Sequence, residues 1–330
     1  MIVAYIGNFG PKHSTENHVA RAFTKRGHRV YMFQEDDPMS WTRLRRWAER
    51  GWPTGSLSEA PDFVLRTRTW ERPEFRAHDT VAALRSAGVP TIAFHLDRWF
   101  GLNREHEVAE QAMFQCDLVV TADGGHQAEF EAAGVRHRWL PPAVSERECL
   151  RTVEAPRSDL DGKIVFVGST GGYHDEWPWR MDLVQWLRAT FGSDFVEIPG
   201  PGQPAIRGQG LVDIYAANAV FVGDSCLAGG ATRYWSDRVP ETLGRRGLLV
   251  HPRVEGIEEH FNINPGGHFV PFEVGDFADL SVAIDEARGM LAADGARRVR
   301  EAAHQHVLAH HTYEVRVDQL LNLAKAQGLL

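Results

Sequence analysis

The chain has 330 residues, of which 43% are hydrophobic and 24% charged, and its formal net charge is −8. This length predicts two domains, the composition is typical of a globular protein whose core needs no metal or disulfide, and the acidic balance disfavours general affinity for nucleic acids. The three cysteines are far apart and form no C-x-x-C pair, which favours thiols in a reducing compartment. The chain opens directly on a strand-like run and has no apolar run of the ~20 residues that cross a bilayer, so we expect a cytoplasmic protein without a membrane span.

The first half alternates short apolar runs with helical patterns. We expect strands at 2–6, 29–33, 63–65, 91–95 and 118–122. Between the first two strands we expect a helix that begins near Ser14 or Thr15 and ends at Gly27. Further helices are expected at 41–49, 74–87, 108–114 and 125–133. Such alternation is typical of a parallel sheet with crossover helices on both of its faces.

Two prolines, Pro141 and Pro142, interrupt this pattern and predict a linker, because proline continues neither a helix nor a central strand. The pattern then restarts. We expect strands at 164–167, 195–198, 219–222 and 248–250, and helices at 179–190, 211–216, 239–243, 277–293 and 296–330. The sequence therefore predicts an α/β protein with two Rossmann-like domains, 1–145 and 146–330, that face each other across a cleft. The last helix, about 312–330, is placed to pack back on the first domain.

Ligands of parallel sheets bind beyond the carboxyl ends of the strands, so the turns there are the candidate sites. The turn from Gly7 to Gly10 lacks the third glycine of G-x-G-x-x-G, which favours an ordinary turn over a dinucleotide site. The polar segment around it contributes candidates whose amides and hydroxyls could meet an anion or a sugar hydroxyl at a helix N-terminus: Asn8, His13, Ser14 and Glu16. Simple helix capping is the equal alternative.

A glycine-bearing turn also follows the first strand of the second half. Gly168, Ser169 and Thr170 open it, and small residues there let backbone amides approach a diphosphate. His174 and Arg180 follow and could supply positive charge. The alternative is a plain flexible turn.

The most specific segment runs from Tyr234 to Gly244. Arg238 and Glu241 are three residues apart, so they share one face of a helical turn. A guanidinium can clamp phosphate, and a carboxylate can accept hydrogen bonds from both hydroxyls of a ribose. A surface salt bridge between the two residues is the alternative.

Two stretches carry a family resemblance: Ser236–Gly244 with Gly247–Pro252, and His310-His311-Thr312-Tyr313-Glu314-Val315-Arg316. They resemble the nucleotide-binding segment and the ending of group-1 type glycosyltransferases of the GT-B fold, similar to spore-maturation-protein-like transferases, over about 164–323. The resemblance implies a donor domain after residue 145 that binds a UDP-, GDP-, ADP- or dTDP-linked sugar, with Glu241 at the ribose and Arg238 at the diphosphate. It implies an acceptor domain before that point, no metal, and a lean towards retention of anomeric configuration. The upstream glutamate of the E-x7-E pattern is replaced here by Arg233.

Transfer needs a group that takes the acceptor proton. The turn after the strand 91–95 supplies the catalytic candidates Asp97 and His95, with a helix cap or an ion pair to Arg98 as the alternative for Asp97. The segment Asp123-Gly124-Gly125-His126 ends the next strand and is placed to line the cleft with it. Trp99 could stack on a sugar face, although buried packing is the more common role of a tryptophan.

Some features favour other interpretations. His306 and His310 have the i, i+4 spacing of a metal pair, but no H-E-x-x-H pattern completes it, so a solvated helical face is favoured and no metal or other cofactor is expected. Arg43, Arg45, Arg46 and Arg50 form a basic patch that keeps modified DNA as a minority option for the acceptor, which is otherwise unidentified. A nucleotide-sugar epimerase and a non-catalytic two-lobed binding protein are the alternative functions.

Overall fold

The computed structural model describes residues 1–51, 59–67, 72–102, 104–170, 178–200, 202–225, 232–293 and 295–330. The chain divides into two compact units. The first unit contains 1–141 and 313–330, and the second unit contains 142–312. The chain therefore enters the second unit between the paired prolines and returns to the first just before Tyr313.

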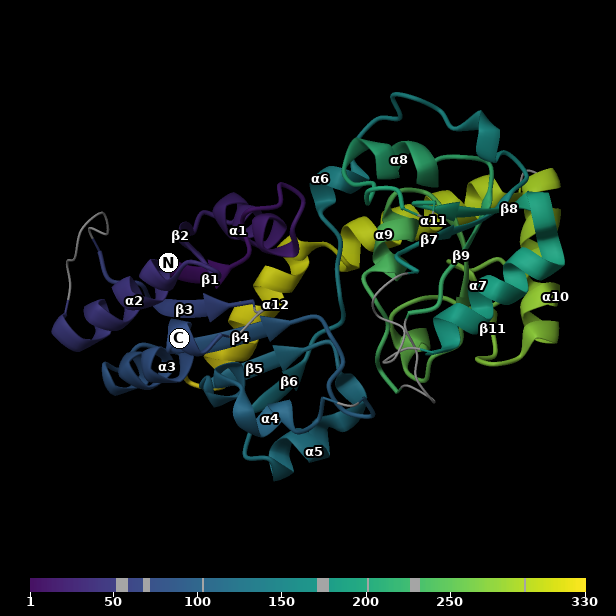
Figure 1. Ribbon diagram of the computed structural model, residues 1–330. Helices are drawn as coiled ribbons and strands as arrows, with labels where there is room; N and C mark the ends of the chain where they lie inside the picture. The colour runs from purple at the N-terminus through teal and green to yellow at the C-terminus, as the bar shows by residue number, and fades with distance from the viewer. Residues whose placement is uncertain are drawn as a thin grey trace. The chain divides into compact units, whose positions relative to one another are not determined.

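The first unit is built on a parallel sheet of six strands within the described residues. From edge to edge the order is β2 (Arg29–Gln34), β1 (Ile2–Gly7), β3 (Phe63–Arg66), β4 (Thr91–His95), β5 (Leu118–Thr121) and β6 (His137–Trp139), as Figure 1 shows. Strand β1 lies between β2 and β3, with Val3 in register with Val30 on one side and Phe63 on the other. The strand order reverses direction at β1, so the loops after β1 and β3 diverge at the position where such sheets bind ligands.

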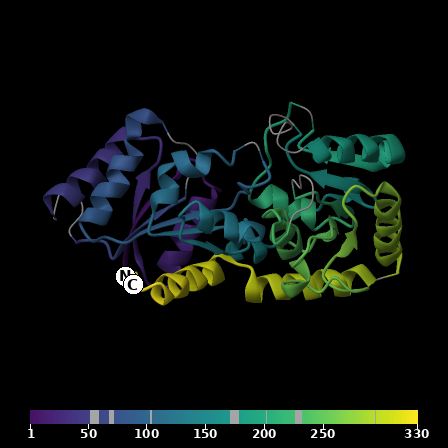
Figure 2. The same cartoon turned by 90° about the horizontal axis from the view of Figure 1, so that it is seen from below.

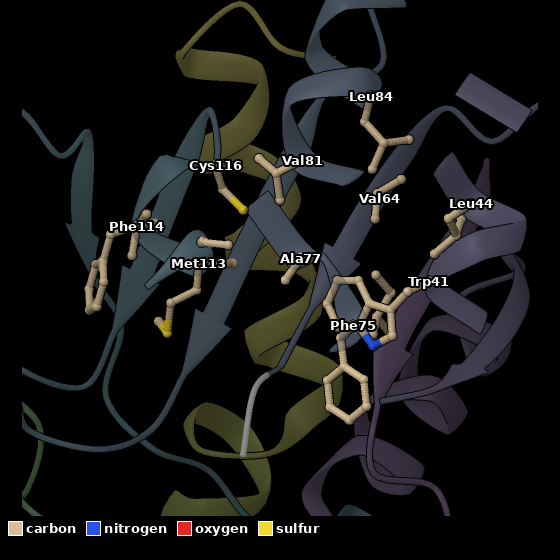
Figure 3. Close-up of a cluster of buried hydrophobic side chains, with 14 of the residues drawn as sticks. Trp41, Leu44, Val64, Phe75, Ala77, Val81, Leu84, Met113, Phe114 and Cys116 are labelled. Atoms are coloured by element: carbon tan, nitrogen blue, oxygen red, sulfur yellow. The ribbon is translucent and has the colours of Figure 1, made fainter. Parts of the chain in front are cut away.

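Helices cover both faces of this sheet. Successive strand residues point to opposite faces, so Ala4 and Ile6 of β1 join the cluster made with α2 (Pro38–Arg50) and α3 (Ala77–Ser86). Figure 3 shows this cluster, in which Trp41 stacks on Phe75 with ring centroids 6.2 Å apart. Phe23 of α1 (Thr15–Lys25) packs on Phe63, on the face of β3 opposite to Val64. The sheet is thus buried on both sides, as parallel sheets require.

The last helix, α12 (Tyr313–Ala326), completes the first unit and lies beside α1, where Figure 2 shows it in yellow. Arg26 donates to both carboxylate oxygens of Asp318 at 2.6–3.0 Å. The Tyr313 ring stacks on His18 with centroids 6.1 Å apart, and Arg316 Nε donates to the carbonyl of Pro141 at 2.6 Å. The tyrosine and arginine of the C-terminal motif therefore anchor α12 in the first unit.

The second unit repeats this plan with a parallel sheet of five strands in the described part of the chain. Their order is β11 (Val270–Phe272), β10 (Leu248–Pro252), β9 (Val220–Val222), β7 (Ile164–Val167) and β8 (Phe195–Ile198). One face packs on α7 (Pro178–Phe191) and α10 (Phe277–Ala292), and the other on α8 (Gln209–Tyr215). The remaining helices are α6 (Glu146–Cys149), α9 (Arg238–Gly244) and α11 (Gly295–His310). The α/β class with two Rossmann-like units is confirmed, and the units are bounded at 141/142 and 312/313 where the sequence predicted one boundary at 145/146.

Several local predictions were wrong. The helix expected at 108–114 is split into α4 (Glu107–Glu110) and a 3-10 turn (Ala112–Gln115), because Gln111 between them is extended. The helix expected over 296–330 is interrupted at His311 and Thr312, where the His311 carbonyl accepts from the amide of Val144 at 3.0 Å. The strands β6 and β11 were missed, because His137 and Arg138 in β6 and Pro271 in β11 leave no uninterrupted apolar run. No helix among the described residues is long and apolar enough to cross a membrane.

Candidate functional site

The second unit has its switch point between β7 and β9, which lie next to each other although β8 comes between them in the sequence. The loop after β7 carries Gly168, Ser169 and Thr170, and the loop after β9 carries Gly223, Asp224 and Ser225. Ligands of doubly wound sheets bind where two such loops part. The predicted glycine-bearing turn therefore stands at the expected position.

Arg180 of α7 ties these two loops together. Its Nε and Nη2 donate to the carboxylate of Asp224 at 2.5 and 3.1 Å, and its Nη1 donates to the Ser169 carbonyl at 3.0 Å. Both side chains are almost completely buried, at 5% and 0% exposed. Since this guanidinium is occupied by the protein, its geometry is that of a loop support.

Arg238 is less buried than Arg180. It is the first residue of α9, is half-buried, and its Nη1 donates to the carbonyl of Val167 at the end of β7. A Cβ at position 168 would lie 3.5 Å from the Arg238 guanidinium carbon and 2.8 Å from the ring of Phe166. Gly168 therefore allows the guanidinium to approach the backbone of the turn.

Glu241 follows one helical turn later on α9 and is 24% exposed. Its nearest cation is Arg245, whose Nη1 lies 3.7 Å from Glu241 Oε1. The structure describes no ion pair between Glu241 and Arg238, so the salt bridge considered as the alternative is not the reason for their spacing. Arg238 and Glu241 lie on one helix at the carboxyl edge of the sheet.

A serine and a histidine that the sequence did not point out support the same edge. Ser225 adopts a left-handed backbone, with φ of 50°, and its Oγ contacts Nε2 of His251 at the end of β10. His251 Nδ1 lies 2.8 Å from the Pro252 carbonyl, to which it donates, and the Ser225 Oγ accepts from the amide of Ser236 at 3.0 Å. Burial lowers the pKa of His251 to about 4, so the neutral ring accepts the serine proton. These bonds hold the segment before α9 against the sheet.

For the other predicted residues at the glycine-bearing turn, the structure gives the exposure of Ser169 and Thr170. Ser169 is exposed and Thr170 half-buried, as a turn open to a ligand requires. His174 lies outside the described residues.

In the first unit, the catalytic candidates His95 and Asp97 lie together at the end of β4. The Asp97 amide donates to His95 Nδ1 at 3.2 Å, and Asp97 Oδ2 lies 3.8 Å from His95 Nε2 and 3.9 Å from Arg104 Nη1. His95 is nearly buried, whereas the Asp97 side chain is 54% exposed. The ion pair expected with Arg98 as the alternative is not described; Arg98 Nε donates instead to the Phe100 carbonyl at 2.8 Å.

Trp99 of the first unit is too buried to stack on a sugar ring. Its side chain is 1% exposed, it meets Phe114 edge to face at 5.0 Å, and the Arg104 guanidinium lies 5.3 Å from its ring centre. The prediction of stacking on a sugar is corrected here, because packing inside the unit covers the ring.

Asp123 is completely buried after β5, so it touches no acceptor directly. Its Oδ2 accepts from the amides of Trp99 and Phe100 at 2.9 and 3.1 Å, and its Oδ1 lies 2.7 Å from Nδ1 of His126. Burial alone would raise the pKa of Asp123, but these hydrogen bonds and His126 outweigh it and hold the pKa below its usual value. Asp123 is therefore a carboxylate that orients a histidine.

The first-unit switch point, after β1 and β3, contains the other acceptor-side candidates. Glu16 is 5% exposed and packs so closely on Gly7 that a Cβ there would lie 2.5 Å from Glu16 Cγ. Burial above all raises the pKa of Glu16 to about 7. Ser14 caps α1 by accepting from the Asn17 amide at 3.2 Å, and Asn8 Oδ1 accepts from Gln34 at 3.2 Å. His13 lies at the rim with its ring 6.3 Å from that of His18.

The C-terminal histidines form a solvated face only in part, because His310 is exposed but His306 is half-buried. His304 and His311 are 1% and 2% exposed, and His306 Nε2 lies 2.6 Å from the His260 carbonyl, to which it donates. His306 packs on His268 of the loop before β11, with ring centroids 4.2 Å apart, and His304 Nδ1 donates to the Gly244 carbonyl of α9 at 2.7 Å. Within the described residues, no group of three His, Cys, Asp or Glu side chains could hold a metal ion.

A family model for glycosyl transferase-like proteins matches residues 147–322, which is more than half of the chain. The chain belongs to the glycosyl transferase-like family. It is a glycosyltransferase whose two Rossmann-like units are those of the GT-B fold.

Solved structures share the fold of this glycosyltransferase at low identity. A glycosyltransferase from Rickettsia africae matches with a TM-score of 0.59 and 12% identity, covering 99% of this chain and 98% of the other. Sucrose-phosphate synthase from Thermosynechococcus elongatus matches at 0.61 and 13%, covering 99% of both chains, and Anabaena HepE matches at 0.59 and 11%, covering 100% of both. No curated protein matches the chain in sequence.

One position of the glycosyltransferase pattern differs in charge. Arg233, in place of the upstream glutamate of E-x7-E, has a left-handed backbone and donates from Nη2 to Glu259 at 2.5 Å. The ion pair directs its guanidinium to the loop after β10. The first glutamate of the E-x7-E pattern is therefore replaced by Arg233, and Glu241 stands at the position of the second glutamate.

Proposed function

We propose that this glycosyltransferase moves a sugar from a nucleoside-diphosphate sugar to a hydroxyl acceptor, with the donor bound by the second unit. The observation that carries the proposal is Arg238 against Gly168 at the β7–β9 switch point, with Glu241 on the same face of α9. A planar guanidinium suits a diphosphate, and an ionised carboxylate suits the two hydroxyls of a ribose.

Support for a uridine nucleotide comes from the fold. HepE has been crystallised with UDP and with UDP-glucose, and its chain is covered over its whole length. UDP-sugars are therefore the first donors to test, ahead of GDP-, ADP- and dTDP-sugars.

Departure of the diphosphate requires positive charge or amide dipoles in place before the reaction. Arg238 and the backbone of the turn after Gly168 would supply them without a metal. Arg180 contributes indirectly, because it fixes the two loops through Asp224 and Ser169. Retention of configuration stays a prediction of the family resemblance, and modified DNA stays a minority option for the acceptor.

The test is a thermal-shift titration with UDP and UDP-glucose on the wild type, Glu241→Ala and Glu286→Ala. Glu286 is an exposed glutamate of α10, so its variant controls for the loss of one surface carboxylate. A ligand at ten times its Kd stabilises a protein by about 1.4 kcal/mol, which raises the Tm by roughly 2–5 °C. We expect this rise in the wild type and in Glu286→Ala and its loss in Glu241→Ala.

The proposal is overturned if none of the four nucleoside diphosphates or their glucose conjugates raises the Tm at millimolar concentration. Product analysis without an added acceptor also separates transfer from the alternative of epimerisation, because an epimerase would return a nucleotide sugar with altered stereochemistry.

A further inference from the structure

Arg245, the residue that follows α9, turns back along the helix onto Glu241. Its Nη1 donates to the Glu241 carbonyl at 3.2 Å and lies 3.7 Å from Glu241 Oε1. The Arg245 side chain is 4% exposed, whereas that of Glu241 is 24% exposed. In the described part of the chain, Glu241 is the one carboxylate that pairs with Arg245. The Glu241 side chain is thus attached to the interior on one side and reaches the surface on the other.

This pairing restricts both side chains. A guanidinium that is removed from water is stabilised only where a negative charge and hydrogen-bond acceptors face it. Glu241 supplies the charge with its carboxylate and an acceptor with its carbonyl. A rotation of the carboxylate away from α9 would leave the Arg245 charge uncompensated in the interior. Arg245 therefore limits the directions in which Glu241 can point.

The other polar groups around Glu241 do not hold its carboxylate. Arg238 donates instead to the backbone at the end of β7. Tyr215 of α8 is 1% exposed, and its phenol is hydrogen-bonded to Thr242. Burial first, and then the charge of Glu241, raises the pKa of Tyr215, so this neighbour is neutral. The position of the Glu241 carboxylate is therefore set by Arg245.

A carboxylate held in one direction suits a ribose better than a deoxyribose. An ionised carboxylate accepts hydrogen bonds and donates none, so its two oxygens match the two neighbouring hydroxyls of a ribose. A 2′-deoxyribose offers one hydroxyl and leaves one carboxylate oxygen without a partner. Sites built around a substrate hydroxyl reject the analogue that lacks it for this reason. Loss of one hydrogen bond to a charged group lowers affinity by about 10–100-fold.

We infer that Arg245 is a positioning residue that fixes the Glu241 carboxylate toward both ribose hydroxyls and thereby restricts the donor to ribonucleoside diphosphates. The inference rests on the proposed function. UDP-, GDP- and ADP-sugars then remain candidate donors, whereas dTDP-sugars lack the 2′-hydroxyl and bind poorly. Without Arg245, the carboxylate turns its unpaired oxygen to water, and ordering it on a ribose lowers the gain from the second hydroxyl. The discrimination between the two sugars therefore depends on Arg245.

The experiment measures the Kd of UDP and of 2′-deoxy-UDP for the full chain by isothermal titration calorimetry. GDP and ADP are compared with their 2′-deoxy forms in the same way. For the nucleotide that binds most tightly, we expect the ribose form to bind about 10–100-fold more tightly than the 2′-deoxy form. A ratio of the two Kd values below about threefold in the wild type overturns the inference.

Three variants test the role of Arg245. Arg245→Met removes the charge and keeps most of the length, and Arg245→Lys keeps the charge without the planar fork of donors. Arg298→Met is the control, because Arg298 is an exposed arginine of α11 in the same unit. We expect the ratio of the two Kd values to fall by about fivefold or more in Arg245→Met and by less in Arg245→Lys. The ratio should stay that of the wild type in Arg298→Met.

The ratio separates positioning from a merely structural role. If Arg245 only supported the fold, its removal would weaken the binding of UDP and 2′-deoxy-UDP by the same factor. An unchanged ratio in Arg245→Met therefore overturns the inference, even where both affinities fall. If Arg245→Met does not fold, Arg245→Lys decides in the same way, and a ratio within about twofold of the wild type overturns the inference.

Failure of the proposed function gives a different result. In that case none of the nucleoside diphosphates binds at millimolar concentration, and the inference falls with the proposed function. Binding of UDP that Glu241→Ala abolishes, together with an unchanged ratio in the Arg245 variants, overturns the inference alone.

Discussion

At the residue scale, the ion pair between Arg180 and Asp224 connects the loops after β7 and β9. Both are buried, and each satisfies the other's hydrogen bonds. We predict that Asp224→Ala lowers the free energy of unfolding by about 3–5 kcal/mol, because an uncompensated guanidinium is left in the interior. Urea titration measures this change.

Asp182→Ala is the control, since Asp182 is exposed on the same helix and its replacement should change the free energy of unfolding by less than about 0.5 kcal/mol. A similar small change for Asp224→Ala would show that the pair does not support the loops.

Glu16 makes the stability of the first unit depend on pH. Its pKa is about 7 in the fold against 4.5 for the ordinary group, so the folded state binds more protons between these values. Stability must then fall as pH rises from 4.5 through 7, by about 3 kcal/mol at most. We predict that Glu16→Gln is more stable than the wild type at pH 8, and that the difference shrinks at pH 5, in urea unfolding at both values.

Taking the difference in unfolding free energy between Glu16→Gln and the wild type at each pH removes the contribution of the groups that titrate in both proteins. Parallel stability curves for Glu16→Gln and the wild type would contradict the raised pKa.

At the scale of elements, α9 is held in place by close packing. A Cβ on Gly244 would lie 2.6 Å from Cys149 Sγ of α6 and 3.0 Å from Val307 of α11. We predict that Gly244→Ala destabilises the protein by about 1–3 kcal/mol, because the three helices must separate. Urea unfolding measures this loss of stability.

The matched change, Gly289→Ala in α10, meets nothing within 4 Å and should stabilise by about 1 kcal/mol through helix propensity. Equal effects of the two substitutions would argue against tight packing around α9.

The alternation of strands and helices was readable in the sequence because most strands are apolar runs bounded by turn residues. Strand 91–95, for example, has the bounds predicted for it. The segments 137–139 and 270–272 are strands through pairing with their neighbours, which their residues do not reveal because neither segment is an uninterrupted apolar run. The break at His311 likewise depends on a backbone bond to Val144, which is far away in the sequence.

At the scale of the whole molecule, the first unit is closed by the end of the chain. Leu320 of α12 is 1% exposed in the first unit, and Leu280 of α10 is 0% exposed in the second. Each leucine-to-alanine change costs about 2–5 kcal/mol in a core. We predict that Leu320→Ala lowers hydrogen-exchange protection in peptides from 1–141, and that Leu280→Ala lowers it in peptides from 142–312.

Equal loss of protection in both units for either variant would contradict this division, since it would mean that the chain unfolds as one body. The comparison uses the same substitution in both places, so the side chain removed is constant.

The α/β class and the two Rossmann-like halves could be predicted from the sequence, because periodicity along the chain is a local property, whereas the roles of Arg238 and Glu241 stay predictions. Tertiary structure alone decided which charged groups are occupied and which are open. Arg180 faces Asp224, 44 residues away, and so supports loops, while Trp99 is covered by Phe114. Asp123 orients His126 while the amides of Trp99 and Phe100 hold its other oxygen, and these contacts join segments that are distant in sequence.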